Sequence, residues 1–305
     1  MAKNGFMLHA EHNLLVLNAG NLELVLSPSL GGAIREFNWV NEGRRVSLLR
    51  QSRKDADSVL DMASFPLVPY VNRIRGGHFT FRGREVVLAS NMAGDISPLH
   101  GQGWLGEWTV ESAGDDRTEL RFEHEAGEWS WSYEARQVIA LDAAGLSLRL
   151  ECRNTSDSAM PCGLGLHPYF PCGSETRIDT EVRTAFEIDE HVLPTAEVPA
   201  TGRYDLKDRA VCGQGLDHGF GGWGGAALLS DPAWPAPLRL SSPTARFFQL
   251  YSPGSGGIFV AEPVTHANAA LNEPEERWAE LGLRVLEPGE EMHLDMRLEL
   301  IGVPA

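Results

Sequence analysis

The sequence predicts an all-β protein, a large antiparallel β-sandwich with few short helices. Two observations predict this class: strand-like segments follow one another from end to end, and helical patterns are scarce. Strands at short, regular spacing with few helices are typical of antiparallel sandwiches and barrels. No low-complexity linker, fixed-period repeat or break in composition divides the 305 residues. We therefore expect one domain spanning residues 1–305.

The predicted strands are short and separated by turn residues. Clusters of Asp, Asn, Gly or Ser close those between residues 108 and 153. Residues 79–88 are expected to form a hairpin that turns at Arg82 and Gly83. In chain order the predicted strands are 14–17, 21–26, the hairpin 79–88, 108–112, 119–124, 131–141, 146–153, 177–188, 238–240, 246–251, 258–262, 280–286 and 291–301.

The end of the chain predicts two strands, 280–286 and 291–301, joined by a turn at 287–290. This turn has the sequence Glu-Pro-Gly-Glu, with proline and glycine in favourable positions. Short helices are expected only within 52–63 and at 273–278. The few helices leave the sheets to form the core.

Composition and charge narrow the class of partner. A formal net charge of −16 argues against nucleic acids and anionic membranes, because both attract a basic surface. The N-terminal residues lack the apolar run of a signal peptide, and no later stretch is apolar enough to span a bilayer. We therefore expect a cytoplasmic protein, either a monomer or a homodimer, whose partner is a small molecule.

The four cysteines form no C-x-x-C pair. They are Cys152, Cys162, Cys172 and Cys212. Their spacing supports neither a zinc site nor a particular disulfide, so free thiols are the expectation for a cytoplasmic protein.

Residues 163–170, with the sequence Gly-Leu-Gly-Leu-His-Pro-Tyr-Phe, suggest a pocket. Alternate residues of a strand point to opposite faces, so Gly163, Gly165 and His167 would share one face. Pro168 removes a backbone donor and ends the strand there. The pattern predicts an imidazole beside open floor left by two glycines. A hydrogen-bonded core histidine is the alternative interpretation.

Two strand residues are polar where an apolar side chain would be more stable. Glu262 shares a face with Ile258 and Val260, and desolvation there would raise its pKa and make it a better base near neutral pH. Gln249 lies between aromatic residues, which suits a ligand with apolar faces and hydroxyl edges. A rim glutamate and a structural amide are the alternatives.

Loop residues supply the remaining candidates. Asn72 and Arg73 lie in a loop rich in proline and glycine, and His100 and Asp217 lie in similar loops. Each could equally be an ordinary surface residue. Residues 219–224 match G-x-G-x-x-G, but neither the strand before them nor the helix after them that a dinucleotide site needs is evident.

Taken together, these segments resemble the aldose 1-epimerase (galactose mutarotase) family. Seven segments occur in the order seen in that family: 72–77, 99–108, 165–170, 217–220, 248–252, 262–269 and 286–290. The resemblance covers nearly the whole chain. It implies the family's large antiparallel β-sandwich with an open sugar cleft, and interconversion of sugar anomers without metal or cofactor.

The resemblance also implies roles for individual residues. Glu262 matches the catalytic base, His167 the general acid and His100 the second active-site histidine. Arg73, Asp217 and Gln249 match groups that hold sugar hydroxyls, and Asn72 accompanies Arg73.

Several functions remain possible at this point. The segment 101–107 lacks the arginine usual in the hexose-6-phosphate 1-epimerase branch, which with the acidic charge favours a free aldohexose such as galactose or glucose. Alternatives are a sugar-phosphate epimerase, a carbohydrate-binding protein without turnover, and a metal enzyme using His100, His167 and Glu262.

Overall fold

A computed structural model describes residues 14–302 of the protein. The structure is built almost entirely from β-strands, with four short 3₁₀ turns (η1–η4) and one short α-helix among these residues. In chain order the elements are β1 (Leu15–Ala19), β2 (Leu22–Ser27), β3 (Ala33–Asn41), β4 (Arg44–Ser47), η1 (Val59–Asp61), β5 (Pro66–Leu67), η2 (Arg75–Gly77), β6 (His78–Phe81), β7 (Arg84–Val87), β8 (Thr109–Ala113), β9 (Arg117–His124), β10 (Tyr133–Asp142), β11 (Gly145–Asn154), β12 (Met160–Cys162), β13 (Gly165–Leu166), β14 (Tyr169–Pro171), β15 (Arg177–Thr180), β16 (Thr184–Ile188), β17 (Pro194–Pro199), η3 (Gly202–Tyr204), β18 (Arg209–Ala210), β19 (Leu216–Gly221), β20 (Ala226–Ser230), β21 (Leu238–Ser241), β22 (Phe247–Ser252), β23 (Ile258–Val264), η4 (Ala270–Asn272), α1 (Glu275–Trp278), β24 (Arg284–Leu286) and β25 (Glu291–Leu300).

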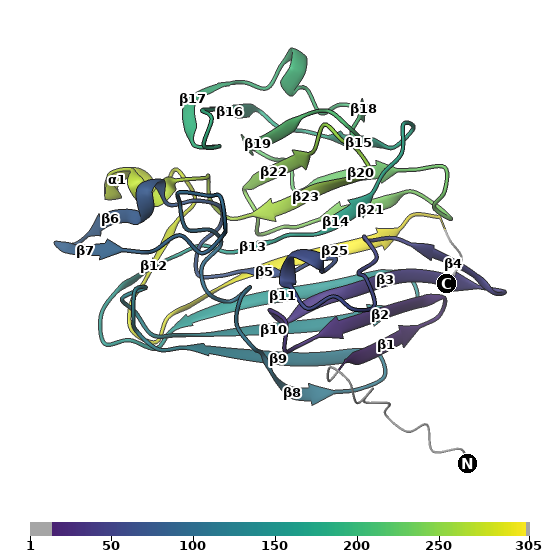
Figure 1. Ribbon diagram of the computed structural model, residues 1–305, viewed down its shortest axis with the longest axis horizontal. Helices are drawn as coiled ribbons and strands as arrows, with labels where there is room; N and C mark the ends of the chain where they lie inside the picture. The colour runs from purple at the N-terminus through teal and green to yellow at the C-terminus, as the bar shows by residue number, and fades with distance from the viewer. Residues whose placement is uncertain (1–13, 303–305) are drawn as a thin grey trace.

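Three antiparallel sheets form the body of the molecule. A nine-stranded sheet has the order β18-β15-β20-β21-β25-β11-β10-β9-β8, and an eight-stranded sheet has the order β17-β16-β19-β22-β23-β13-β5, with β14 also paired to β23. The strands β1–β4 form a third sheet. Figure 1 shows β1–β4 lying over β9–β11 in the lower half, and the eight-stranded sheet continuing upward beside β20 and β21. The predicted all-β sandwich class is confirmed.

Burial alternates along the long central strands, as an antiparallel sandwich requires. In β10, Tyr133, Ala135, Gln137 and Ile139 are buried, and the residues between them are more exposed. The one polar residue of this inward row is satisfied, because Gln137 donates to the Gly32 carbonyl across the sandwich at 2.9 Å. Aromatic rings fill much of the remaining core, the largest being Trp104, Trp108, Trp129, Trp131 and Trp278.

Most predicted strands are present, but two segments divide differently. The hairpin at 79–88 is confirmed as β6 and β7. The predicted strand 177–188 is two strands, β15 and β16, which join different sheets. The predicted strands 280–286 and 291–301 exist as β24 and β25, yet they do not pair with each other: β24 pairs with β12 and β25 with β11 and β21. The helix expected within 52–63 is only the turn η1, and that at 273–278 is α1.

The expectation of four free thiols is wrong. Cys172 and Cys212 form a disulfide with Cα atoms 5.6 Å apart, whereas Cys152 and Cys162 are free and buried. The spacing gave no sign of this pair, because the intervening strands β15 and β18 bring the two ends together only in the folded sheet.

None of the helices within residues 14–302 is long and apolar enough to cross a membrane.

Candidate active site

A pocket of about 250 Å³ opens on the eight-stranded sheet. Six of the seven predicted site residues line it, and they come from β19, β23, the β13–β14 junction, and the loops after β5 and β7. The complete lining is Leu60, Phe65, Asn72, Arg73, Met92, Leu99, His100, Trp104, His167, Tyr169, Asp217, Tyr251 and Glu262. The seventh predicted residue, Gln249, is buried and is not part of the lining.

The register of the sheet explains why His167 meets Glu262. Gly165 pairs with Val264 and Tyr169 pairs with Val260, so the same register places His167 opposite Glu262. Residues paired in this way share one face of a sheet. Glu262 in turn pairs with Gln249 on β22. Three residues distant in sequence therefore form one row across the sheet.

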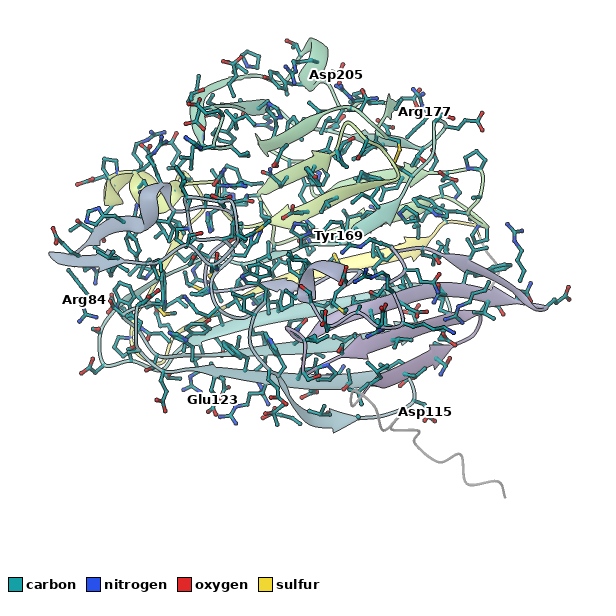
Figure 2. All side chains as sticks on the ribbon, in the orientation of Figure 1. Arg84, Asp115, Glu123, Tyr169, Arg177 and Asp205 are labelled. Carbon is teal, nitrogen blue, oxygen red and sulfur yellow. A yellow bond between two sulfur atoms is a disulfide. The ribbon has the colours of Figure 1, made fainter. Side chains whose placement is uncertain are left out.

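His167 and Glu262 are in direct contact. His167 Nε2 lies 3.4 Å from Glu262 Oε1, and the two residues are only 8% and 2% exposed. The imidazole packs against both Phe65 and Tyr169, whose ring centroids each lie 4.6 Å from its own. Figure 2 shows Tyr169 near the middle of the molecule. The two side chains therefore touch, with no gap as wide as a sugar ring between them.

Burial changes the proton affinity of both groups. It raises the pKa of Glu262 well above its ordinary value; the nearby Asp217 charge adds to this rise and Arg73 opposes it. Burial also lowers the pKa of His167 to about 3. Glu262 Oε2, His167 Nδ1 and Asn72 Nδ2 are buried and have no hydrogen-bond partner among the described residues. Such atoms are ready to bond a polar ligand.

His100 and Asn72 fix each other through the backbone. The Asn72 amide donates to His100 Nδ1 at 3.1 Å, and the His100 amide donates to the Asn72 carbonyl at 3.0 Å. Both residues have positive φ, near 61° and 55°, which is uncommon for residues with side chains. Burial lowers the pKa of His100 well below its ordinary value, so the ring stays neutral. With Nδ1 accepting, Nε2 carries the proton and can donate it in a hydrogen bond.

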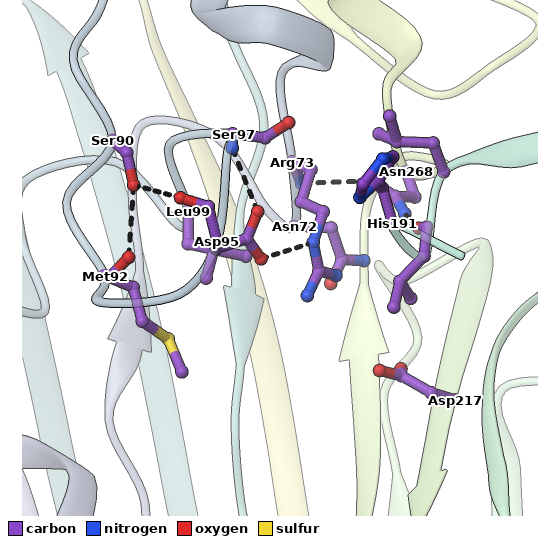
Figure 3. Close-up of polar contacts among 12 residues, drawn as sticks. Asn72, Arg73, Ser90, Met92, Asp95, Ser97, Leu99, His191, Asp217 and Asn268 are labelled. Carbon is purple, nitrogen blue, oxygen red and sulfur yellow. Dashed lines mark hydrogen bonds and ion pairs between the residues drawn. The ribbon is translucent and has the colours of Figure 1, made fainter. Parts of the chain in front are cut away.

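Arg73 and Asp217 add further polar groups to the wall of the pocket. Arg73 Nε donates to Asp95 Oδ2 at 2.8 Å, and Asp95 in turn accepts from the Ser97 amide at 2.9 Å (Figure 3). Gln249 Nε2 donates to Asp217 Oδ1 at 2.8 Å, so Gln249 holds Asp217 rather than lining the pocket. Burial raises the pKa of Asp217. The sequence reasoning missed Asp95, since no pattern ties this loop aspartate to an arginine 22 residues away.

The prediction of an open floor beside Gly163 and Gly165 is wrong. A Cβ at Gly163 would lie 1.9 Å from His266 Cδ2, and one at Gly165 would lie 2.5 Å from Val71 Cγ1. These glycines allow a histidine and a valine to pack closely against the strand. The space of the pocket lies instead between aromatic side chains and loop residues such as Phe65, Tyr169 and His100.

The metal-site alternative finds no support in the arrangement of the donors. Among residues 14–302, no group of three or more His, Cys, Asp or Glu side chains could hold a metal ion. His100 also commits its Nδ1 to the Asn72 amide.

A larger cavity, of about 530 Å³, lies elsewhere, at residues 180–183 and 222–224. Its charged side chains include Lys207, which is paired with Glu181 at 2.6 Å, and its lining contains no histidine. The smaller pocket holds the groups suited to proton transfer, and we take it as the candidate active site.

Comparison with known proteins identifies the family of the chain. The profile of the family described as aldose 1-epimerase matches residues 13–299. A curated relative, the uncharacterized protein YphB of Escherichia coli K12, is 31% identical to this chain. The aligned region covers 94% of this chain and 98% of YphB. A solved structure from the same organism is also 31% identical and covers the same shares of the two chains, with a TM-score of 0.84.

A second solved structure, a galactose mutarotase-like protein from Clostridium acetobutylicum, has a TM-score of 0.85 at 21% identity and covers 96% of each chain. At that identity the likeness shows the fold alone. The match of the family profile across nearly the whole length, together with the YphB relative, shows more: the chain belongs to the aldose 1-epimerase family.

Proposed function

We propose that the protein is an aldose 1-epimerase that interconverts the α and β anomers of a free aldohexose such as galactose or glucose. The observation that carries this proposal is the buried contact of 3.4 Å between His167 and Glu262 in a pocket that also presents Arg73 and Asp217. Membership of the aldose 1-epimerase family supports it. The reaction needs an acid and a base and hydrogen bonds to hydroxyls, which these residue types supply.

The proposed reaction opens and recloses the sugar ring. Glu262 takes the proton of the C1 hydroxyl while the bond between C1 and the ring oxygen breaks, and His167 protonates that oxygen. The resulting aldehyde rotates about the C1–C2 bond and presents its other face. On closure the ring oxygen attacks C1 and returns its proton to His167, and Glu262 returns its proton to the C1 oxygen. No net proton is gained or lost.

The pair must hold one transferable proton. Burial alone favours the uncharged arrangement, with the proton on Glu262, because it raises the pKa of Glu262 and lowers that of His167. Sugar hydroxyls that donate to Glu262 would stabilise its carboxylate and favour moving the proton to His167. Substrate binding thus prepares the acid and base forms that ring opening needs.

Other polar groups hold the sugar while C1 moves. Arg73 and Asp217 are suited to bond the distant hydroxyls, and Nε2 of His100 can donate to an oxygen nearer the pair. Asn72 Nδ2 offers a further donor.

The charges of the pocket favour a neutral sugar over a sugar phosphate. Arg73 is the cationic side chain in the lining, and Asp95 already pairs with it. Asp217 and Glu262 are acidic. A phosphate group would therefore meet two acidic side chains and a cation whose charge Asp95 already offsets.

Polarimetry on freshly dissolved α-glucose and α-galactose tests the proposal. We expect His167→Asn and Glu262→Gln each to lower kcat by roughly 10²–10⁴-fold, because each removes one partner of the proton exchange. Circular dichroism should show both variants folded. Near-wild-type rates in both would refute the assignment of the pair.

The same assay separates the alternatives. A binding protein would give heat on mixing with sugar in calorimetry yet leave the spontaneous rate of mutarotation unchanged. A phosphate-specific enzyme would turn over α-glucose 6-phosphate faster than α-glucose. A metal enzyme would lose activity on chelation. The cytoplasmic location and the monomeric or homodimeric state stay predictions.

A further inference from the structure

The loop that carries Arg73 is held along one edge by side chains instead of a strand. We call residues 70–75 the Arg73 loop. Its Val71 amide donates to His266 Nε2 at 3.0 Å, and its Arg73 amide donates to Asn268 Oδ1 at 2.9 Å. The Arg75 amide donates to Asn272 Oδ1 at 2.7 Å. All three acceptors lie on residues 265–272, which follow the strand of Glu262.

The alternate amides of the loop point the other way. The Asn72 amide donates to His100, and the Ile74 amide donates to the Pro98 carbonyl at 3.3 Å. Successive amides of the loop thus face opposite edges, although the positive φ of Asn72 keeps the loop from being a regular strand. One edge of the Arg73 loop is therefore bound by residues 98–100, and the other by residues 265–272.

Asn268 occupies the central position on that second edge. It is 8% exposed, and besides accepting from the Arg73 amide it donates through Nδ2 to the Val192 carbonyl at 2.8 Å. The Arg73 carbonyl accepts from the Ala269 amide at 3.2 Å. Figure 3 shows the hydrogen bond between Asn268 and Arg73, with Asp217 lower in the view. One side chain thus links the Arg73 loop with the turn between β16 and β17.

We propose that Asn268 is a positioning residue for substrate binding, which fixes Arg73 at a set distance from Glu262. Asn268 is only six positions after Glu262 in the chain, and one hydrogen bond joins Asn268 to the backbone of Arg73. This inference rests on the proposed function, in which Arg73 holds a sugar hydroxyl. Asn268 itself touches neither the sugar nor the reacting atoms, since it does not line the pocket.

His266 supports the same arrangement. Its Nδ1 lies 2.7 Å from the Ala267 carbonyl and donates to it, which leaves Nε2 as the acceptor for Val71. Burial lowers the pKa of His266 to about 4, so this neutral form persists at the pH where the enzyme is assayed. The contact at Val71 keeps the start of the loop in place when Asn268 is changed.

The first test compares Asn268→Leu with Asn268→Asp. Leucine removes both hydrogen bonds, and we expect KM to rise by about tenfold while kcat changes by less than about threefold, because the acid–base pair is untouched. Aspartate keeps an acceptor for the Arg73 amide and should restore KM toward the wild-type value. A KM unchanged in Asn268→Leu would overturn the proposal.

Asn154→Leu is the matched control. Asn154 is fully buried and bonds the carbonyls of Ser158 and Leu286 at 2.9 and 2.8 Å, but it does not line the pocket. We expect this variant to lower the melting temperature and leave KM unchanged. An equal rise of KM in both leucine variants would mean that general loosening is the cause, and would contradict a specific role for Asn268.

Hydrogen exchange without sugar separates this inference from the proposed function. We expect the Arg73 amide to exchange at least about tenfold faster in Asn268→Leu than in the wild type, and at the wild-type rate in Asn154→Leu. Equal protection of Arg73 in the wild type and Asn268→Leu would refute the contact. If the wild type fails to accelerate mutarotation, the proposed function fails, whereas this exchange result still decides whether Asn268 holds the loop.

Discussion

Burial of Glu262 serves the proposed proton transfer, but it destabilises the folded protein when the carboxyl ionises. The carboxyl is 2% exposed, and burial raises its pKa well above the ordinary value, helped by Asp217 and opposed by Arg73. A group whose pKa is higher in the folded state contributes stability that is complete below its unfolded pKa, and that is lost as the pH rises through its folded pKa. The folded protein therefore becomes less stable as the pH rises and Glu262 ionises.

Glu262→Gln should therefore stabilise the protein at alkaline pH, although it lowers kcat by roughly 10²–10⁴-fold. Glutamine has nearly the shape of the protonated acid and cannot ionise, so we expect a higher melting temperature than wild type at pH 8, with the difference shrinking toward pH 4. Thermal unfolding across this range measures it. Glu291→Gln, at an exposed position, is the control and should leave the profile unchanged. A Glu262→Gln variant no more stable than wild type at pH 8 would contradict the raised pKa.

At the scale of elements, the interruption between β13 and β14 creates the site. Both short strands pair with β23, one on each side of His167, and Pro168 prevents a continuous ladder. At His167 the pairing with β23 is interrupted, and Glu262 is the residue of β23 that lies opposite. Gly163, just before β13, lets His266 pack beneath this junction. The junction and the Arg73 loop are thus coupled, since His266 also bonds Val71.

Gly163→Ala tests this coupling. The added Cβ would lie 1.9 Å from His266 Cδ2, so the ring must move and its bond to the Val71 amide should break. We expect a loss of about 1–3 kcal/mol in the free energy of unfolding, the usual cost of overpacking, measured by urea denaturation. Gly173→Ala is the control, because a Cβ there meets nothing within 4 Å. Equal stability of the two variants would refute close packing at Gly163.

At the scale of the whole molecule, the disulfide ties together parts of both large sheets. Cys172 follows β14 of the eight-stranded sheet and Cys212 precedes β19, with β15 and β18 of the nine-stranded sheet between them. The two cysteines are 40 residues apart in sequence. Closing a loop of this length removes conformational freedom mainly from the unfolded chain.

Reduction of this bond should lower stability. We expect the free energy of unfolding to fall by about 4 kcal/mol, the loop-closure value for this length, when denaturation is repeated with dithiothreitol. Thiol titration in denaturant should find two reactive groups before reduction, Cys152 and Cys162, and four after it. The double variant Cys172→Ser/Cys212→Ser should be insensitive to reductant. Four reactive thiols in protein purified without reductant would refute the bond.

The sequence by itself determined the fold class and pointed to six of the residues that line the candidate pocket. Alternating apolar residues and frequent turns leave only sheets to bury the core, so the all-β class follows from periodicity. The same periodicity placed Glu262 on an apolar face, and the proline after His167 marked the end of a strand. These are local properties, which neighbouring residues decide.

Only the tertiary structure decided distances and partners. Register between strands far apart in sequence placed His167 against Glu262 and bonded Gln249 to Asp217. The fold also placed His266 in the space beside Gly163. It also paired Arg73 with Asp95, and Cys172 with Cys212. Each of these contacts joins segments whose separation along the chain carries no information about their separation in space. The physical reason is that sheet pairing is chosen by burial over the whole molecule, whereas a sequence pattern reports only on one strand at a time.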